Sequence, residues 1–256
     1  MTTLSQKLER PQFNIIARKK ILGSPLISRV ELEPIGYVHC RRRYRFEAPR
    51  QGVYAPGNAI IRLLPDRGYE EGLIGLHKFS YIWTHFVFHL NETWHPKVKP
   101  PVPGELDEVG VFASRSPHRP NRLGLSCVEL VEIKGLDLHI RNHDFLDLTP
   151  VLDIKPYVAY YDSFPDAATG WLPAPPPLYQ IAFTTAAEAT ATAIMSNGGP
   201  DLASFCQVQL GCEPLNPERK KIEKLTETRY ITICRGHKIF WEINQTHRVI
   251  TIIEII

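Results

Sequence analysis

Three arginines lie within one short segment, FASRSPHRPNRLGLS at residues 112–126, which contains no acidic residue. They are Arg115, Arg119 and Arg122. Pro117 and Pro120 prevent a regular helix here, because proline lacks an amide proton and clashes with the preceding turn. We therefore expect a rigid loop that displays guanidinium groups, which suit phosphate or carboxylate recognition. An ordinary basic surface loop is the alternative interpretation.

Three carboxylates flank a second segment, DFLDLTPVLDIKPY at residues 144–157. They are Asp144, Asp147 and Asp153. Carboxylates at the rim of a barrel could bind ribose hydroxyls, balance a cation or accept a proton. Asp153 and Lys155 should share one face of a strand, since side chains two residues apart do so. Turn formation and structural ion pairing would explain the same aspartates without any chemistry.

A further basic cluster, RRRYRFEAPRQ at residues 41–51, holds five arginines and one glutamate within residues 41–50. Tyr44 and Phe46 lie among these charges, and aromatic rings can stack on nucleic acid bases. A solvated edge strand, protected from aggregation by its charges, would have the same composition.

Other reaction classes have weaker support. His85 and His89 are four residues apart and could serve a metal hydrolase, but there is no HExxH pattern and no third ligand nearby. We therefore expect no resident metal. The sequence also lacks a P-loop, a GxGxxG motif after a strand and a GxSxG elbow, so neither a Rossmann nucleotide site nor a serine hydrolase is supported.

The composition of the chain excludes several classes of protein. The chain has 256 residues, of which 43% are hydrophobic, enough to bury a core and to exclude a wholly disordered protein. A formal charge of +3 is too small to indicate a nucleic acid partner by itself. Five cysteines without a CxxC pair favour a reducing cytoplasm over a disulfide scaffold. The first residues lack the apolar run of a signal peptide, and the longest apolar stretch, 81–90, is too short for a membrane span.

Short segments rich in β-branched and aromatic residues predict strands over most of residues 31–161. These strands are expected at 37–46, 59–64, 81–88, 109–113, 125–131, 136–140 and 151–154. This pattern predicts a mainly β fold, either a barrel or a sandwich. The proline-containing insertion at 91–108 is more typical of a binding loop or lid than of a plain connector.

The rest of the chain divides at proline-rich and basic segments. Residues 1–30 form a basic N-terminal extension, 31–165 the β domain and 166–178 a stiff proline-rich linker. Residues 179–256 are predicted to form a small α+β C-terminal domain. A capping box at Thr185–Glu188 should begin a helix that ends near 197–199, and a second helix should follow Pro200 and Asp201 and end at Gly211. Strands are expected at 229–234, 238–244 and 248–255.

The two long motifs, together with PRQ at 49–51, FVFH at 86–89 and Asp162, resemble the TsaA/TrmO family in the same order. The resemblance covers about residues 31–165, and the C-terminal part is similar to that of longer bacterial members. It implies a small TsaA-like β-barrel that binds S-adenosylmethionine. It further implies a homodimeric enzyme that methylates N6 of threonylcarbamoyladenosine at position 37 in the anticodon loop of tRNA.

The resemblance also assigns residues. The cofactor would be held by Arg50, Gln51, His89, Leu90, Arg115, Leu125, Arg141, Asn142, His143 and Asp144. We expect Leu125 to pack on the adenine, and Arg115 to bind either the methionine carboxylate or an RNA phosphate. Asp147 and Asp153 are the candidate proton acceptors. Phosphates of the tRNA would be contacted by Arg41, Arg43, Arg45, Arg119 and Arg122, with help from the C-terminal domain.

Three departures from the family pattern leave a second function open. Leu148 stands where the family favours glycine, Arg122 replaces a proline, and residues 213–221 lack the DPRPxY run of bacterial members. The alternative is therefore an S-adenosylmethionine-binding RNA-binding or regulatory protein with little methyl transfer.

Overall fold

The computed structural model describes residues 30–54, 56–100, 107–172, 175, 177–216 and 220–256. Tertiary contacts divide the chain into two units, residues 1–33 and 34–256. Of the first unit only residues 30–33 are described, and they form no helix or strand, so the predicted basic extension lies almost entirely outside the described residues. No helix within the described ranges has both the length and the hydropathy that crossing a membrane demands.

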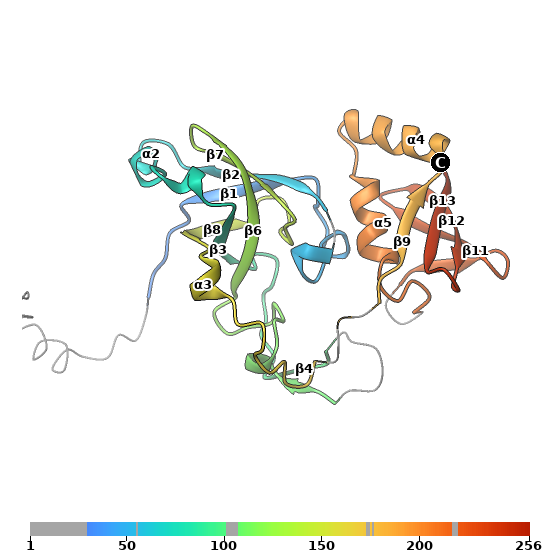
Figure 1. The fold of residues 1–256 in the computed structure, drawn as a ribbon, viewed down its shortest axis with the longest axis horizontal. Helices are drawn as coiled ribbons and strands as arrows, with labels where there is room; N and C mark the ends of the chain where they lie inside the picture. The colour runs from blue at the N-terminus through green and yellow to red at the C-terminus, as the bar shows by residue number, and fades with distance from the viewer. Residues whose placement is uncertain (1–29, 55, 101–106, 173–174, 176, 217–219) are drawn as a thin grey trace, which may run out of the picture. The chain divides into compact units, whose positions relative to one another are not determined.

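Six antiparallel strands close into a barrel (Figure 1), which confirms the predicted mainly β fold and decides between barrel and sandwich. Around the barrel the order is β1-β2-β7-β6-β3-β8, and β8 pairs back onto β1. The strands are β1 (Gly36–Cys40), β2 (Asn58–Leu63), β3 (Tyr81–Val87), β6 (Leu123–Lys134), β7 (Asp137–Arg141) and β8 (Pro150–Pro156).

Alternation of side chains builds the barrel core. In β3, Ile82, Thr84 and Phe86 point inward and are buried, while the residues between them are more exposed. Ile61 of β2 and Leu138 of β7 are both 0% exposed. Burying such a side chain stabilises the fold by about 1.5–3 kcal/mol, so the period-two pattern accounts for which face of each strand lies inside.

One end of the barrel carries three long connections. Because neighbouring strands are antiparallel, the connections β1–β2 (residues 41–57), β3–β6 (88–122) and β7–β8 (142–149) all leave from the same end. We call these three connections and the adjoining strand ends the motif rim. The β1–β2 connection contains the short 3-10 turns η1 (Arg45–Glu47) and η2 (Gly52–Tyr54). The β3–β6 connection contains β4 (Lys97–Val98), β5 (Val109–Gly110) and η4 (Val111–Ala113).

The opposite end carries shorter connections. Between β2 and β3 lie α2 (Tyr69–Gly72) and η3 (Leu76–Lys78), and a tight turn joins β6 to β7. A single helical turn, α3 (Ala159–Asp162), follows β8.

The strand predicted at 37–46 ends at Cys40, so the edge-strand interpretation of the arginine cluster is wrong. The carboxylate of Glu47 accepts hydrogen bonds from the backbone amides of Arg43 (2.6 Å) and Tyr44 (3.0 Å). These bonds turn the chain out of the sheet. The strand predicted at 109–113 is likewise shorter, because it continues as η4 after Gly110.

The C-terminal residues form a five-stranded sheet with two helices, as the α+β prediction requires. The strand order is β10 (Ile222–Lys224), β11 (Arg229–Cys234), β12 (His237–Asn244), β13 (Val249–Ile255) and β9 (Gln180–Phe183). Sequence patterns missed β9 and β10, which are short, and β9 runs parallel to β13. Trp241, 0% exposed, lies in the core of this part and stacks on Tyr230.

Both predicted helices are present as α4 (Thr185–Ser196) and α5 (Leu202–Leu210). The cap of α5 is Asp201, whose side chain accepts from the amide of Ser204 at 2.9 Å. The capping box predicted at Thr185–Glu188 is wrong by one residue, since Thr184 is the N-cap and accepts from the amide of Ala187. Alanine at the third helical position has no side-chain acceptor with which to complete a box.

Candidate functional site

The motif rim brings together the residues that the two sequence motifs contain. Its first connection supplies Arg50 and Gln51, and the long second connection supplies His89, Leu90 and Arg115. Leu125 lies near the start of β6, and residues 141–144 end β7 and begin the third connection. Segments up to 94 positions apart in the sequence thus meet at one end of the barrel because the sheet closes.

A direct bond joins the PRQ segment to the arginine loop. Nη1 of Arg115 donates to Oε1 of Gln51 at 2.6 Å, and Nε2 of Gln51 donates to the carbonyl oxygen of Arg50 at 2.7 Å. The amide of Gln51 therefore orients the Arg115 guanidinium, whose remaining N–H donors can serve an anion.

Asp144 is a partly buried carboxylate at the rim. Burial raises its pKa, whereas a hydrogen bond from Ser126 and the positive charges of Arg42 and Arg115 act in the opposite direction. Oγ of Ser126 donates to Oδ1 of Asp144 at 2.6 Å. A carboxylate held in this way can accept hydrogen bonds from hydroxyl or amino groups of a ligand.

The end of β7 is fixed by Glu129 of β6. Its carboxylate forms an ion pair with Arg141 and accepts from Nδ2 of Asn142 at 3.2 Å. Asn142 adopts a left-handed backbone with φ of 56°, a conformation that asparagine tolerates better than most residues. The chain can therefore turn sharply at the mouth of the barrel.

His143 points into the protein, and its side chain is only 1% exposed. Its Nδ1 accepts a hydrogen bond from the amide of Phe145 at 3.2 Å, and burial lowers its pKa to about 3, so the ring is neutral. The predicted contact of His143 with a cofactor is therefore restricted to its main chain.

Apolar side chains border the same rim. Leu90, Leu123 and Leu125 are 42%, 43% and 54% exposed. The guanidinium of Arg45 donates to the carbonyl oxygen of Leu90 and holds that segment in place. His89 precedes it, and partial burial lowers the pKa of its imidazole. A flat apolar ligand group could pack on this surface.

The two candidate proton acceptors lie in different places. Asp147 belongs to the rim, where its Oδ1 accepts from the amide of Cys40 at 3.0 Å. Asp153 lies in the middle of β8, opposite the outward-facing His85, and forms the predicted ion pair with Lys155. Asp153 therefore lies within the barrel wall, at the level of His85 and two strands away from Leu125 of β6.

The five arginines predicted to contact RNA divide into two groups. Arg45, Arg119 and Arg122 donate to backbone carbonyls of the rim, Arg119 to Val111 at 3.2 Å and Ser114 at 2.9 Å, and Arg122 to Asn91 at 3.1 Å. For Arg41 and Arg43, no side-chain hydrogen bond or ion pair is found in the part of the chain that the structure describes. These two have their charges available for a ligand.

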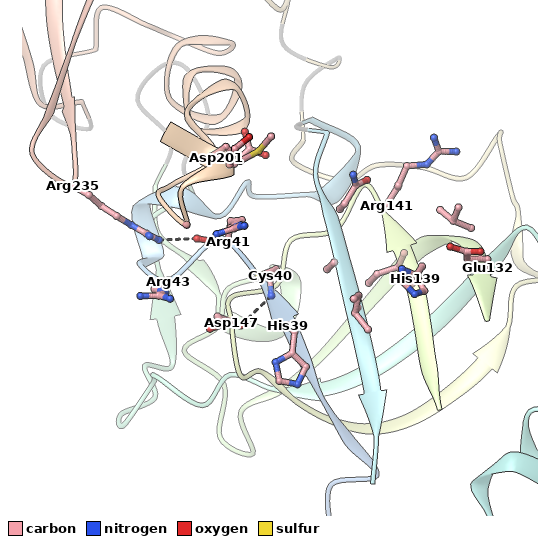
Figure 2. A pocket seen from close by; sticks show the side chains of 18 residues that line it. His39, Cys40, Arg41, Arg43, Glu132, His139, Arg141, Asp147, Asp201 and Arg235 are labelled. Carbon is pink, nitrogen blue, oxygen red and sulfur yellow. Dashed lines mark hydrogen bonds between the residues drawn. The ribbon is translucent and has the colours of Figure 1, made fainter. Parts of the chain in front are cut away.

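Arg41 and Arg43 line a cleft of about 800 Å³ on the outer wall of the barrel (Figure 2). The barrel contributes His39, His139 and Arg141 to it, and the C-terminal part contributes Met195, Asp201 and Arg235. The cleft is distinct from most of the predicted cofactor residues, of which only Arg141 lines it.

Sequence reasoning missed four residues that shape the rim: Arg42, Glu47, Gly52 and Ser126. A Cβ on Gly52 would overlap the carbonyl oxygen of Asn142 and lie 2.7 Å from its carbonyl carbon. Only glycine allows the first and third connections to approach so closely. The glycine directly after PRQ was a visible signal, but one arginine among five gave no sign that Arg42 would be buried.

Comparison with known proteins identifies the family. A family model described as the tRNA-methyltransferase O N-terminal domain matches residues 37–163. A tRNA (adenine(37)-N6)-methyltransferase of Escherichia coli K12 is 31% identical over 224 residues, which cover 85% of this chain and 94% of that protein. The chain belongs to the tRNA-methyltransferase O family.

Other members agree with this assignment. A putative S-adenosylmethionine-dependent methyltransferase, RcsF of Pseudomonas aeruginosa, is 43% identical over 149 residues, 57% of this chain and 64% of that protein, just under two thirds of its length. The crystal structure of TrmO from Pseudomonas aeruginosa superposes with a TM-score of 0.67 at 29% identity and covers 91% of this chain and all of that one.

Two departures from the tRNA-methyltransferase O pattern have visible consequences. Leu148, at the position where glycine was expected, adopts a left-handed backbone with φ of 60°. The turn is thus made by a residue with a Cβ, at a conformational cost. Arg122 is also left-handed, with φ of 54°. The third departure, at 213–221, includes residues 217–219, which lie outside the described residues.

One residue of the predicted linker forms a hydrogen bond with the motif rim. Nε1 of Trp171 donates to the carbonyl oxygen of Ala113 at 2.9 Å. Residues 173, 174 and 176 of the linker lie outside the described residues, so the boundary at 166–178 stays a prediction. Among described residues, no group of three or more His, Cys, Asp or Glu side chains is arranged to hold a metal ion.

Proposed function

We propose that this chain is an S-adenosylmethionine-dependent tRNA methyltransferase that acts on N6 of adenosine 37, with threonylcarbamoyladenosine as its substrate. One observation carries the proposal. In a chain of this family, closure of the barrel joins the PRQ and arginine motifs through the Gln51–Arg115 bond, beside the half-buried carboxylate of Asp144.

The rim offers groups that match each part of the cofactor. Asp144 can accept hydrogen bonds from hydroxyl or amino groups, Arg115 can pair with a carboxylate, and Leu125 presents apolar surface to a purine. S-adenosylmethionine, when bound, supplies a methyl group activated by a positively charged sulfonium. The residues present therefore fit the cofactor.

Alignment of donor and acceptor is the main demand on these residues, because methyl transfer to nitrogen is an in-line displacement. The braced Arg115 and Asp144 provide fixed points for that alignment. The accepting N6 also loses a proton, and we assign its removal to Asp147 rather than Asp153. Asp147 lies in the same connection as Asp144 and also lines the cleft, whereas Asp153 lies within β8 and is already paired with Lys155.

Arg41 and Arg43 are the arginines we propose to contact tRNA phosphates. Both line the cleft on the outer barrel wall. Arg45, Arg119 and Arg122 contribute chiefly by holding the rim connections, because part of each guanidinium is engaged there.

The deciding experiment is incubation with labelled S-adenosylmethionine and tRNA, followed by nucleoside mass spectrometry. We expect label in methylated threonylcarbamoyladenosine, and none in tRNA from cells unable to make that nucleoside. Binding of the cofactor without methyl transfer would instead favour the regulatory RNA-binding alternative, to which the Leu148 departure points. Absence of cofactor binding would contradict both.

We further propose a homodimer in the cytoplasm. Phe112 of the β3–β6 connection is 76% exposed, and aromatic side chains are enriched at protein–protein interfaces. None of the five cysteines, all of which are described, forms a disulfide, as a reducing compartment allows. Light scattering of the purified protein tests the dimer, and a monomeric mass at micromolar concentration would exclude it.

A further inference from the structure

Arg42 is a buried cation that contacts two connections of the motif rim. It is 5% exposed, although it lies between Arg41 and Arg43, which line the cleft. Nη1 donates to the carbonyl oxygen of His143, and Nη2 donates to the carbonyl oxygen of Pro56 at 3.1 Å. The guanidinium therefore bridges the end of the β1–β2 connection and the segment 142–144.

A third contact reaches the C-terminal part of the chain. Nη2 of Arg42 lies 2.7 Å from Oγ of Ser204 in α5, and Ser204 is itself 3% exposed. Asp201, the N-cap of the same helix, adds a favourable charge near the guanidinium. A buried guanidinium is tolerated only where its donors are satisfied, and here the acceptors come from three separate segments.

The backbone around the guanidinium leaves room for it. A Cβ on Gly57 would lie 2.6 Å from Nη2 of Arg42, closer than such atoms approach in proteins. The carbonyl oxygen of Gly57 accepts from the amide of Asn142 at 3.1 Å. Glycine at this position thus admits the guanidinium directly beside the bond that anchors residue 142.

We infer that Arg42 is a positioning residue for the cofactor segment 142–144, and that it couples this segment to helix α5. The inference deepens the proposed function, on which it rests for the identity of the ligand. We assign Arg42 no direct contact with cofactor or RNA. It acts by fixing the carbonyl of His143, and hence the backbone that carries Asp144.

A second, partly buried arginine provides a matched control. Arg235 pairs with Glu47 at 2.6 Å and also donates to the carbonyl oxygen of Arg41 at 2.7 Å. It therefore joins the C-terminal part to the same β1–β2 connection, through the same kind of side chain. Arg235 does not share the hydrogen bonds that Arg42 donates to the carbonyl oxygens of Pro56 and His143.

The test compares Arg42→Met with Arg235→Met in the full-length protein. Calorimetric titration with S-adenosylmethionine should show at least a tenfold loss of affinity for Arg42→Met, and a change within twofold for Arg235→Met. The affinity of Arg42→Met for tRNA should stay within twofold of the wild type. Arg42→Lys, which keeps one charged donor, should restore part of the lost cofactor affinity.

Hydrogen exchange on the ligand-free protein provides a second readout. Amides of residues 142–146 should exchange at least tenfold faster in Arg42→Met than in Arg235→Met, and Gly57→Ala should reproduce this acceleration by displacing the guanidinium. Equal exchange in the two methionine variants, or equal cofactor affinity, would overturn the inference. Failure of the wild type to bind cofactor would count against the proposed function alone, because the exchange comparison still decides the role of Arg42.

Discussion

Gln51 and Arg115 are 64 residues apart in the sequence, and the Oε1 atom of the first accepts from Nη1 of the second at 2.6 Å. The bond connects two rim segments that share no strand. The bond orients the otherwise flexible side chain of Arg115. The conformational entropy of this side chain is therefore lost when the protein folds and not when a ligand binds.

Loss of this bond should weaken cofactor binding without unfolding the protein. Gln51→Leu leaves Arg115 unbraced, and we expect about a tenfold weaker affinity for S-adenosylmethionine, since a charge-assisted hydrogen bond contributes about 1.5–3 kcal/mol. Calorimetry provides the measurement. Arg62→Gln is the control, because it breaks an exposed pair with Asp137 away from the rim. Equal affinities for wild type and Gln51→Leu would show that the brace has no role in binding.

Gly52→Ala should separate the first and third rim connections. The added methyl would overlap the backbone of Asn142, which cannot move aside as a side-chain end can. We expect a loss of about 1–3 kcal/mol in the free energy of unfolding, measured by urea denaturation, together with weaker cofactor binding. Gly72→Ala, whose Cβ meets no atom within 4 Å, should be close to neutral. A Gly52→Ala protein as stable as Gly72→Ala would contradict the close approach.

Leu148→Gly should stabilise the protein. A left-handed backbone costs a non-glycine residue roughly 1–2 kcal/mol, and the side chain of Leu148 is 56% exposed, so little packing is lost. After the entropy that glycine adds to the unfolded chain, a net gain of about 0.5–1 kcal/mol should appear in urea denaturation. Leu148→Ala keeps the strained backbone and should show no gain, so stabilisation of both variants alike would exclude relief of strain as the cause.

His143 should make stability depend on pH. Burial lowers its folded pKa to about 3, below the unfolded value near 6.5, so between these values the unfolded chain binds more protons. The free energy of unfolding should therefore fall by up to about 1.4 kcal/mol per pH unit as pH decreases from about 6.5 towards about 3. Urea denaturation at several pH values tests this. His143→Gln cannot titrate, and its stability should fall less steeply over this range; identical slopes would argue against a neutral buried imidazole.

Arg41 and Arg43 should dominate the electrostatic part of tRNA binding. Each change to glutamine removes one cation from the cleft wall, and the plot of log affinity against log salt should become shallower by about one unit per residue. Fluorescence anisotropy with labelled tRNA measures this slope. Arg67→Gln is a surface control on the β2–β3 connection at the opposite end of the barrel. If the control flattens the slope as much as the cleft variants do, the cleft is not the phosphate-binding surface.

The sequence by itself determined the mainly β class, five of the six barrel strands to within a few residues, and the two C-terminal helices. These depend on local patterns, namely period-two alternation and helix caps, which operate over a few residues. It also marked the two motifs from which the rim is built. For the remaining barrel strand, β1, the predicted C-terminal end is too late. The carboxylate that turns the chain away after Cys40 belongs to Glu47, seven residues further along the sequence.

Tertiary structure alone decided which members of each charged cluster are available to a ligand. Arg41, Arg42 and Arg43 are identical in type and adjacent, yet only the middle one is buried, because Pro56, His143 and Ser204 supply its acceptors. Asp147 and Asp153 likewise differ through their places in the barrel. Closure of the sheet brings distant segments together. The burial, the partners and the charge of a side chain are therefore fixed by its neighbours in space and not by its neighbours in the sequence.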